Sequence, residues 1–266
     1  MTIAIDAGNS DLKLATVVDG RVGPVERFPT ADPPDPLVLA ERIAELGFEG
    51  PPRPIVALVS VVPALTELVR EAARVVGARL LIADAGTIPI AARVPHPGRV
   101  GSDRLLGAWG ARLHHGAPLI VVDLGTATTV DAVDAAGDFV GGAILPGLRL
   151  ALASLARGTA QLPEVRLSEP ERAIGTDTAA AIRSGVVLGH LGAIRELVER
   201  FTGELAPDGR RPVVVATGGI TFAGWAREAL LGAGSAGRPP IADVVDPDLL
   251  LRSLDLLASH RLAATA

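Results

Sequence analysis

Short blocks of apolar residues, separated by turn-forming residues, run through the first 115 positions. Compact blocks predict strands at 3–5, 12–18, 54–62 and 79–82, with a further short strand beginning at Arg21. Apolar residues at helical spacing predict helices over 37–46, 63–76 and 101–114. Initial strands followed by alternating strands and helices are typical of an α/β layer fold.

The second half of the chain opens with another apolar block. Residues 118–122 form a continuous apolar run, which favours a buried strand, and a second strand is expected at 130–133. Helices are predicted at 148–160, 179–201, 223–231 and 248–260, and strands at 212–216 and 241–244. The boundary between the halves is expected near residues 114–117.

The two halves share a pattern when the sequence is shifted by 117 residues. The matched pairs are Asp6 with Asp123, Gly8 with Gly125, and Gly20 with Gly137. In each half an apolar strand ends in Asp-x-Gly, and a second strand and a hairpin glycine follow. We interpret this as an internal duplication. It predicts two duplicated α/β lobes, 1–115 and 116–266, with a cleft between them and one Asp-x-Gly turn of each lobe facing it.

Composition removes several classes of function. The 266 residues include no Cys, which excludes disulfides, thiolate nucleophiles and Cys-ligated metals. The net charge of −5 argues against a general nucleic-acid binder. Without a bilayer-length apolar run or a basic N-terminal leader, we expect a cytoplasmic protein that does not bind membranes. The single Lys, Lys13, follows Leu12 rather than Gly, so the chain has no Walker A loop.

The Asp-x-Gly turns are the strongest candidates for chemistry. A glycine after a strand lets backbone N–H groups approach an anion closely, and nearby hydroxyls add donors. Those hydroxyls belong to Ser10, Thr126, Thr128 and Thr129. The carboxylates of Asp6 and Asp123 would repel phosphate unless a cation such as Mg²⁺ lies between them. The alternative is two tight hairpins capped by Asp, but their matched positions favour phosphate binding.

Two further segments are compatible with a nucleotide site. Gly218 lies in a Thr-Gly-Gly turn that follows the predicted strand 212–216. Asp103 and Arg104 stand in the first turn of the predicted helix 101–114. Asp103 has two interpretations there: a carboxylate favoured by the helix dipole, or the acceptor of a substrate proton in phosphoryl transfer, with Arg104 binding an anionic group.

The ordered motifs of the chain resemble those of type III pantothenate kinases, in the acetate-kinase/actin/Hsp70-like superfamily. The matching segments are Asp6–Ser10 (DAGNS), Gly101–Arg104 (GSDR), Asp123–Thr129 (DLGTATT), Gly141–Gly147 (GGAILPG), Ile174–Thr178 (IGTDT) and Ala216–Gly219 (ATGG). The resemblance implies two ribonuclease-H-like lobes, a homodimer, and ATP-dependent phosphorylation of pantothenate, the first step of coenzyme A biosynthesis.

The resemblance also implies roles for individual residues. Asp103 would be the catalytic base, and pantothenate would be bound by Gly101, Ser102, Arg104 and, across the dimer, Thr178. ATP would be bound by Asp6, Gly8, Asn9, Ser10, Lys13, Gly125, Thr126, Thr128, Thr129 and Gly218. Asp6 would also position Mg²⁺, and Asp123 would hold a monovalent cation, K⁺ or NH₄⁺.

Other functions stay open at this point. Val94 and Gly107 stand where the family usually has Tyr and Asn. These differences motivate a second hypothesis, a catalytically weak or inactive nucleotide-binding regulator of the same fold. A third is a kinase that acts on a related small hydroxy acid.

Overall fold

The computed structural model describes residues 1–47, 55–206, 209–232 and 239–263, which belong to two compact units. The first unit contains residues 1–114 together with the chain from Asp248, and the second contains His115–Pro247. The expected lobes, 1–115 and 116–266, differ from these units by the C-terminal segment. That segment packs on the sheet of the first unit. Each unit is described separately below.

The first unit is built on a mixed sheet in the order β3-β2-β1-β5-β6, with β4 paired to β2. Its strands are β1 (Thr2–Ala7), β2 (Asp11–Val18), β3 (Arg21–Val22), β4 (Glu26–Pro29), β5 (Ile55–Ser60) and β6 (Arg79–Ala83). β1 is antiparallel to β2 and parallel to β5. The buried strand β1 therefore lies in the middle of the sheet and ends at the first Asp-x-Gly turn.

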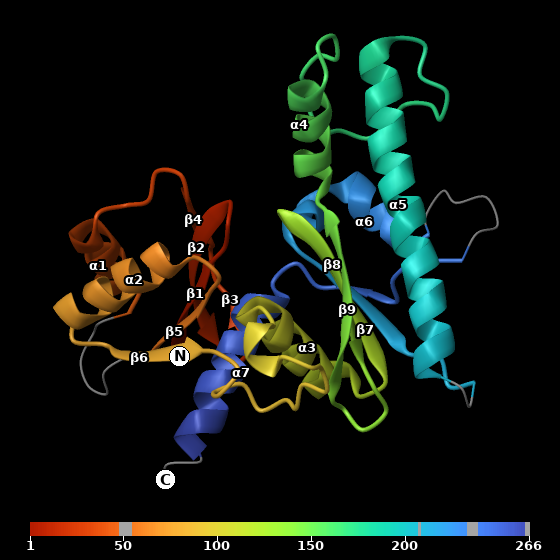
Figure 1. The fold of residues 1–266 in the computed structure, drawn as a ribbon. Helices are drawn as coiled ribbons and strands as arrows, with labels where there is room; N and C mark the ends of the chain where they lie inside the picture. Colours follow the sequence, from red (N-terminus) through yellow and green to blue (C-terminus); the bar gives the residue numbers. More distant parts are fainter. Residues whose placement is uncertain (48–54, 207–208, 233–238, 264–266) are drawn as a thin grey trace. The chain divides into compact units, whose positions relative to one another are not determined.

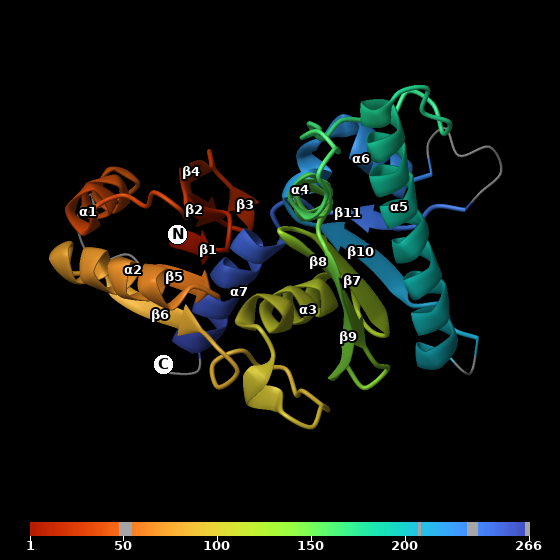
Figure 2. The ribbon, with the colours of Figure 1, turned by 45° about the horizontal axis from the view of Figure 1, so that its top comes forward.

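Helices cover both faces of this sheet (Figure 2). The helices are α1 (Pro36–Glu45), α2 (Pro63–Val75), α3 (Ser102–His115) and α7 (Leu249–Ala263), with a 3₁₀ turn at Pro97–Arg99. Residues of α1 and α2 share one apolar core with Ile3 and Ile5 of β1. Because side chains alternate along a strand, Ala4 and Asp6 point to the opposite face, and α7 contacts β1 there.

The second unit repeats this arrangement in the sheet order β9-β8-β7-β10-β11. Its strands are β7 (Leu119–Leu124), β8 (Ala127–Val133), β9 (Phe139–Pro146), β10 (Val213–Thr217) and β11 (Val244–Val245). The two sheets have the same strand order and the same pattern of antiparallel and parallel pairs. Gly20 and Gly137 lie in corresponding hairpins. The topology therefore agrees with the predicted duplication and with the α/β fold class.

The helices of the second unit are α4 (Leu148–Gly158), α5 (Thr178–Leu205) and α6 (Gly224–Leu230), with a 3₁₀ turn at Gly219–Phe222. All three contribute to one core against β7 and β10. α4 and α5 run side by side in Figure 1. In the part of the chain that the structure describes, no helix is both long and apolar enough to cross a membrane.

Candidate functional site

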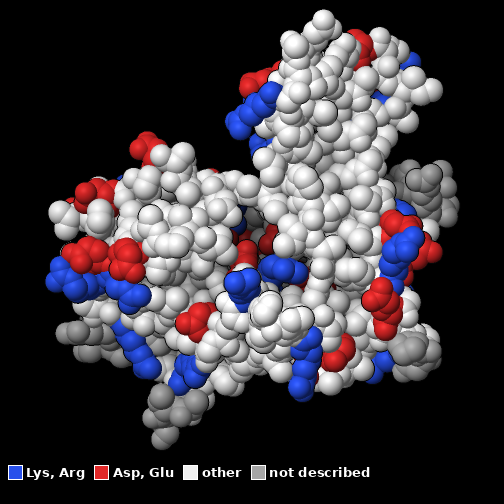
Figure 3. Space-filling view, viewed as in Figure 1, with Lys and Arg blue, Asp and Glu red and all other residues white. Residues whose placement is uncertain are grey.

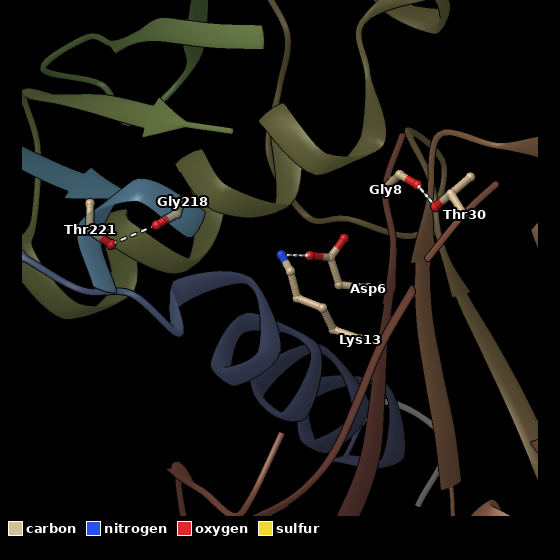
Figure 4. Close-up of polar contacts among 6 residues, drawn as sticks. All are labelled: Asp6, Gly8, Lys13, Thr30, Gly218 and Thr221. Carbon is tan, nitrogen blue, oxygen red and sulfur yellow. Dashed lines mark hydrogen bonds and ion pairs between the residues drawn. The ribbon is translucent and has the colours of Figure 1, made fainter. Parts of the chain in front are cut away.

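Asp6 and Lys13 form an ion pair at the end of the first hairpin (Figure 4). They are directly opposite each other in the β1–β2 register, and Lys13 Nζ lies 2.7 Å from Asp6 Oδ2. The side chain of Asp6 is 9% exposed and that of Lys13 is 24% exposed. A buried carboxylate needs such a partner, because leaving it unpaired away from water is costly.

The turn after Asp6 is held by a residue that the sequence motif does not include. Gly8 N–H donates to Asp11 O, which closes the turn. Thr30 Oγ1 donates to Gly8 O at 2.7 Å, and Thr30 N–H donates to Ser10 O at 2.9 Å. Asn9 and Ser10 remain exposed at the tip of the turn. Thr30 thus fixes the backbone of the predicted phosphate turn from a position about twenty residues away in the sequence.

The start of α3 carries the other candidates of the first unit. Ser102 Oγ donates to Ser60 O at 3.1 Å, which anchors the helix start to the end of β5. Asp103 Oδ1 accepts the backbone N–H of Arg104 at 2.8 Å. A Cβ at Gly101 would overlap Asp103 Oδ1, so a side chain at Gly101 would displace the carboxylate. These three contacts fix the position of Asp103.

The environment of Asp103 makes its carboxylate more basic. Burial is the largest cause and raises the pKa of Asp103, the backbone N–H of Arg104 opposes that rise, and the negative charge of Asp6 adds to it. A carboxylate whose pKa moves toward neutrality is a better proton acceptor at physiological pH. Asp103 therefore interacts electrostatically with Asp6, which is itself paired with Lys13.

In the second unit, several predicted residues meet at the carboxyl ends of β7 and β10. Asp123 and Thr217 are partners in the parallel register, which places Gly218 beside Asp123. A Cβ on Gly218 would overlap Asp123 Oδ1 and the backbone of Leu124. Thr126 O accepts the N–H of Gly147 at 3.1 Å, so the end of β9 supports the second turn.

Thr128 and Thr129 have side-chain partners inside the second unit. Thr128 Oγ1 lies 2.9 Å from Nε2 of His190 on α5, and both residues are buried. Burial lowers the pKa of His190. Thr129 Oγ1 donates to Asp131 Oδ2 at 2.9 Å. A phosphate contact from Thr128 would therefore use its backbone more readily than its hydroxyl, because the hydroxyl is already bonded inside the core.

Thr178 begins α5 beside a cavity of about 680 Å³ in the second unit. The residue is exposed, and Asp177 caps the helix by accepting the N–H of Ala180. The cavity is lined mainly by α5 and the end of α4, including Leu155, Leu162, Thr176, Ile182 and Val186. In Figure 3, basic and acidic side chains are intermixed over the visible face of each unit.

The carboxylates of Asp6 and Asp123 supply hard oxygen donors, which suit Mg²⁺ and a monovalent cation such as K⁺. Among the described residues, no group of three or more His, Asp or Glu side chains is placed to hold a metal ion. Mg²⁺ is commonly held by one or two carboxylates together with substrate phosphates and water. Asp6 fits that role, and Asp123, beside the backbone of Gly125 and Gly218, offers an oxygen ligand for a monovalent cation.

Solved structures of other proteins share the fold of this chain. The chain is similar to a putative 2-dehydro-3-deoxygalactonokinase from Sinorhizobium meliloti, with a TM-score of 0.56 and 17% identity, covering 98% of this chain and 99% of that one. It is also similar to MreB5 of Spiroplasma citri bound to ADP, with a TM-score of 0.54 and 13% identity, covering 99% and 98%. The chain therefore shares its fold with these two proteins.

Sequence comparison identifies the family. The profile of the type III pantothenate kinases matches residues 2–200. A type III pantothenate kinase from Rhodospirillum centenum is 37% identical, over 99% of this chain and 100% of that protein. Another, from Rubrobacter xylanophilus, is 47% identical over 62% of this chain and 60% of that protein. The chain belongs to the type III pantothenate kinase family, whose members phosphorylate pantothenate in coenzyme A biosynthesis.

Proposed function

We propose that this protein transfers the γ-phosphoryl group of ATP to the primary hydroxyl of pantothenate. The observation that carries the proposal is the fixed carboxylate of Asp103, whose pKa is raised by burial and by the charge of Asp6. In the reaction the hydroxyl oxygen bonds to the γ-phosphorus, the bond to the β–γ bridging oxygen breaks, and ADP leaves. Asp103 Oδ2 accepts the hydroxyl proton, since Oδ1 already accepts the Arg104 N–H.

The neighbours of Asp103 would orient pantothenate. Arg104 would bind an anionic group of the substrate, because its guanidinium stays charged and offers several donors. Gly101 leaves room for the carboxylate of Asp103, and Ser102 holds the helix start against β5. Catalysis of this kind depends mainly on positioning and on neutralising charge.

The two glycine turns would bind the phosphates of ATP through backbone N–H groups. In the first unit these residues are Gly8, Asn9 and Ser10, with Lys13 nearby. In the second unit they are Gly125, Thr126, Thr128, Thr129 and Gly218. Asp6 would hold Mg²⁺ and Asp123 a monovalent cation, K⁺ or NH₄⁺. When bound, these ions would offset the negative charge of the phosphates.

The proposal includes a homodimer in the cytoplasm. The family resemblance assigns Thr178 to the pantothenate site of the neighbouring subunit. Its exposure at the start of α5, beside the cavity described above, is compatible with a contact to a second copy. Sedimentation of the purified protein tests the dimer, and loss of pantothenate affinity in Thr178→Ala tests the role of the residue.

A coupled assay of ADP release with pantothenate, Mg²⁺ and K⁺ tests the activity. Asp103→Asn removes the proton acceptor and keeps the size of the side chain, so kcat should fall by about 10²–10⁴-fold. The KM for ATP should change little, because Asp103 is assigned to the hydroxyl rather than to the nucleotide. Glu67→Gln, an exposed charge on α2, is the matched control and should retain wild-type turnover.

The same assay separates the proposal from its alternatives. Asp103→Asn with near-wild-type turnover would remove Asp103 from this role. A wild-type protein that binds ATP but releases no ADP with pantothenate would instead be a nucleotide-binding regulator. Turnover with a related hydroxy acid but not with pantothenate would assign a different substrate.

A further inference from the structure

Lys13 is the only Lys among 25 basic side chains of the Lys and Arg type. A lysine ammonium is a compact point charge on a flexible stem, unlike the planar guanidinium of arginine. It can therefore serve as a small cation that moves over a short distance while it stays attached to the chain. Because Lys13 lies opposite Asp6, its ammonium can compete with a metal ion for the Asp6 carboxylate.

The sheet places Lys13 where it must contact Asp6. The β1–β2 register aligns the two residues, so their side chains extend from the same face of the sheet. Lys13 Nζ is 2.7 Å from Asp6 Oδ2, and the carboxylate is almost completely buried. The ammonium is thus paired with Oδ2, one of the two oxygens that the Asp6 carboxylate could offer to a metal ion.

Two other charged residues strengthen this pairing. Arg27 of β4 is directly opposite Lys13 in the β2–β4 register, and like charges in that position repel each other. The carboxylate of Asp103 also interacts electrostatically with Asp6. Repulsion from Arg27 and the added negative charge that Asp103 contributes near Asp6 both favour the position of the ammonium on Asp6.

We propose that Lys13 is a tethered cation that keeps divalent metal off Asp6 until a nucleotide binds. Phosphate oxygens of the arriving nucleotide then accept hydrogen bonds from the Lys13 ammonium, which leaves Asp6. The Asp6 carboxylate becomes available to Mg²⁺ that arrives with the nucleotide. This inference rests on the proposed function in taking Asp6 as the magnesium position and the first glycine turn as a phosphate site.

Desolvation explains why the nucleotide must bind before Mg²⁺ can reach Asp6. Removing water from Mg²⁺ is costly. A buried carboxylate that is already paired with an ammonium gains too little from binding Mg²⁺ to offset that cost. Removing the ammonium alone would leave a buried charge without a partner, which is strongly unfavourable. A nucleotide supplies phosphate oxygens for both cations at once, so the exchange leaves neither the carboxylate nor the ammonium unpaired.

Binding of Mn²⁺ to the nucleotide-free protein tests the inference, with free Mn²⁺ measured by electron paramagnetic resonance. Lys13→Met removes the charge and keeps a stem of similar length, so it should bind Mn²⁺ at least tenfold more tightly than wild type. Lys13→Arg keeps the charge and should resemble wild type. Adding Asp6→Asn to Lys13→Met should abolish the gain. Saturating ADP should allow wild type to bind Mn²⁺ as tightly as Lys13→Met does.

Equal Mn²⁺ affinity of wild type and Lys13→Met without nucleotide would overturn the inference. So would a gain that survives Asp6→Asn. Should Lys13→Met not fold by circular dichroism, Lys13→Gln provides the same comparison. The ADP-release assay is a separate readout: a wild type that phosphorylates pantothenate yet binds Mn²⁺ at Asp6 without nucleotide would refute the role of Lys13 and leave the proposed activity intact.

Discussion

Replacing Gly218 by Ala should damage the end of β10, where the second unit brings Asp123 and Gly125 together. The backbone of Gly218 has φ 95° and ψ 166°, a conformation that is essentially restricted to glycine. Forcing another residue into such a conformation costs about 1–3 kcal/mol. The added Cβ would also lie 2.6 Å from two backbone atoms of Leu124 and would overlap Asp123 Oδ1.

The two costs can be combined into an expected change in stability. Backbone atoms cannot rotate away as a side chain can, and overpacking of this kind typically costs a further 1–3 kcal/mol. We therefore expect Gly218→Ala to lower the free energy of unfolding by at least about 2 kcal/mol. For a protein of this size that corresponds to a fall in Tm of at least about 4 °C.

Differential scanning calorimetry is the appropriate assay, because two units need not unfold in one two-state transition. Gly219→Ala is the matched control: nothing lies within 4 Å of a Cβ built there, so its Tm should stay within about 1–2 °C of wild type. Because Asp123 would be displaced, Gly218→Ala should also weaken ATP binding. If both variants melted together at the wild-type temperature, the close packing of Gly218 on β7 would be refuted.

Two further predictions concern residues that support the turns. Thr30→Val removes the hydrogen bond to Gly8 O, so the free energy of unfolding measured in urea should fall by about 1 kcal/mol. The KM for ATP should rise in the same variant. Thr30→Ser keeps the hydroxyl, so its stability and its KM for ATP should stay close to those of wild type. Burial lowers the pKa of His190 below its ordinary value near 6.5, so the unfolded chain takes up this proton first as the pH falls. Stability should therefore be fully retained above about pH 6.5 and decline below it by up to about 1.4 kcal/mol per pH unit until the folded-state pKa is reached. His190→Gln, which can still bond Thr128, should flatten that decline in unfolding measured from pH 7 to pH 5; an unchanged slope would show that another group is responsible.

The elements of the two sheets were predictable where apolar runs are unbroken, as in β1, β5 and β7. β9 was not predicted, because Gly141 and Gly142 interrupt its pattern and because it lies at the sheet edge, where β8 is its single partner among the described strands. The last strand was expected at 241–244 but forms at Val244–Val245. The reason is that the N–H groups of Ile241 and Ala242 donate to Leu230 O instead of to a neighbouring strand.

The candidate site was predictable as far as motifs reach along the chain. The sequence placed Asp103 in the first turn of a helix, and the structure agrees. It could not show that Thr30 binds Gly8 or that His190 binds Thr128, since those partners lie 22 and 62 residues apart. No local pattern marks such pairs, because a single threonine or histidine is equally compatible with many surroundings.

The position of α7 has a consequence for how the protein is made. This helix is the last element that the structure describes, and it packs on β1 and β5 with seven of its residues buried. Emerging from the ribosome, residues 1–114 would have one face of their sheet uncovered until residues 249–263 have been synthesised. The segment 115–247, although synthesised later, contains all of its own elements and can become compact first, so the order of folding would be opposite to the order of synthesis.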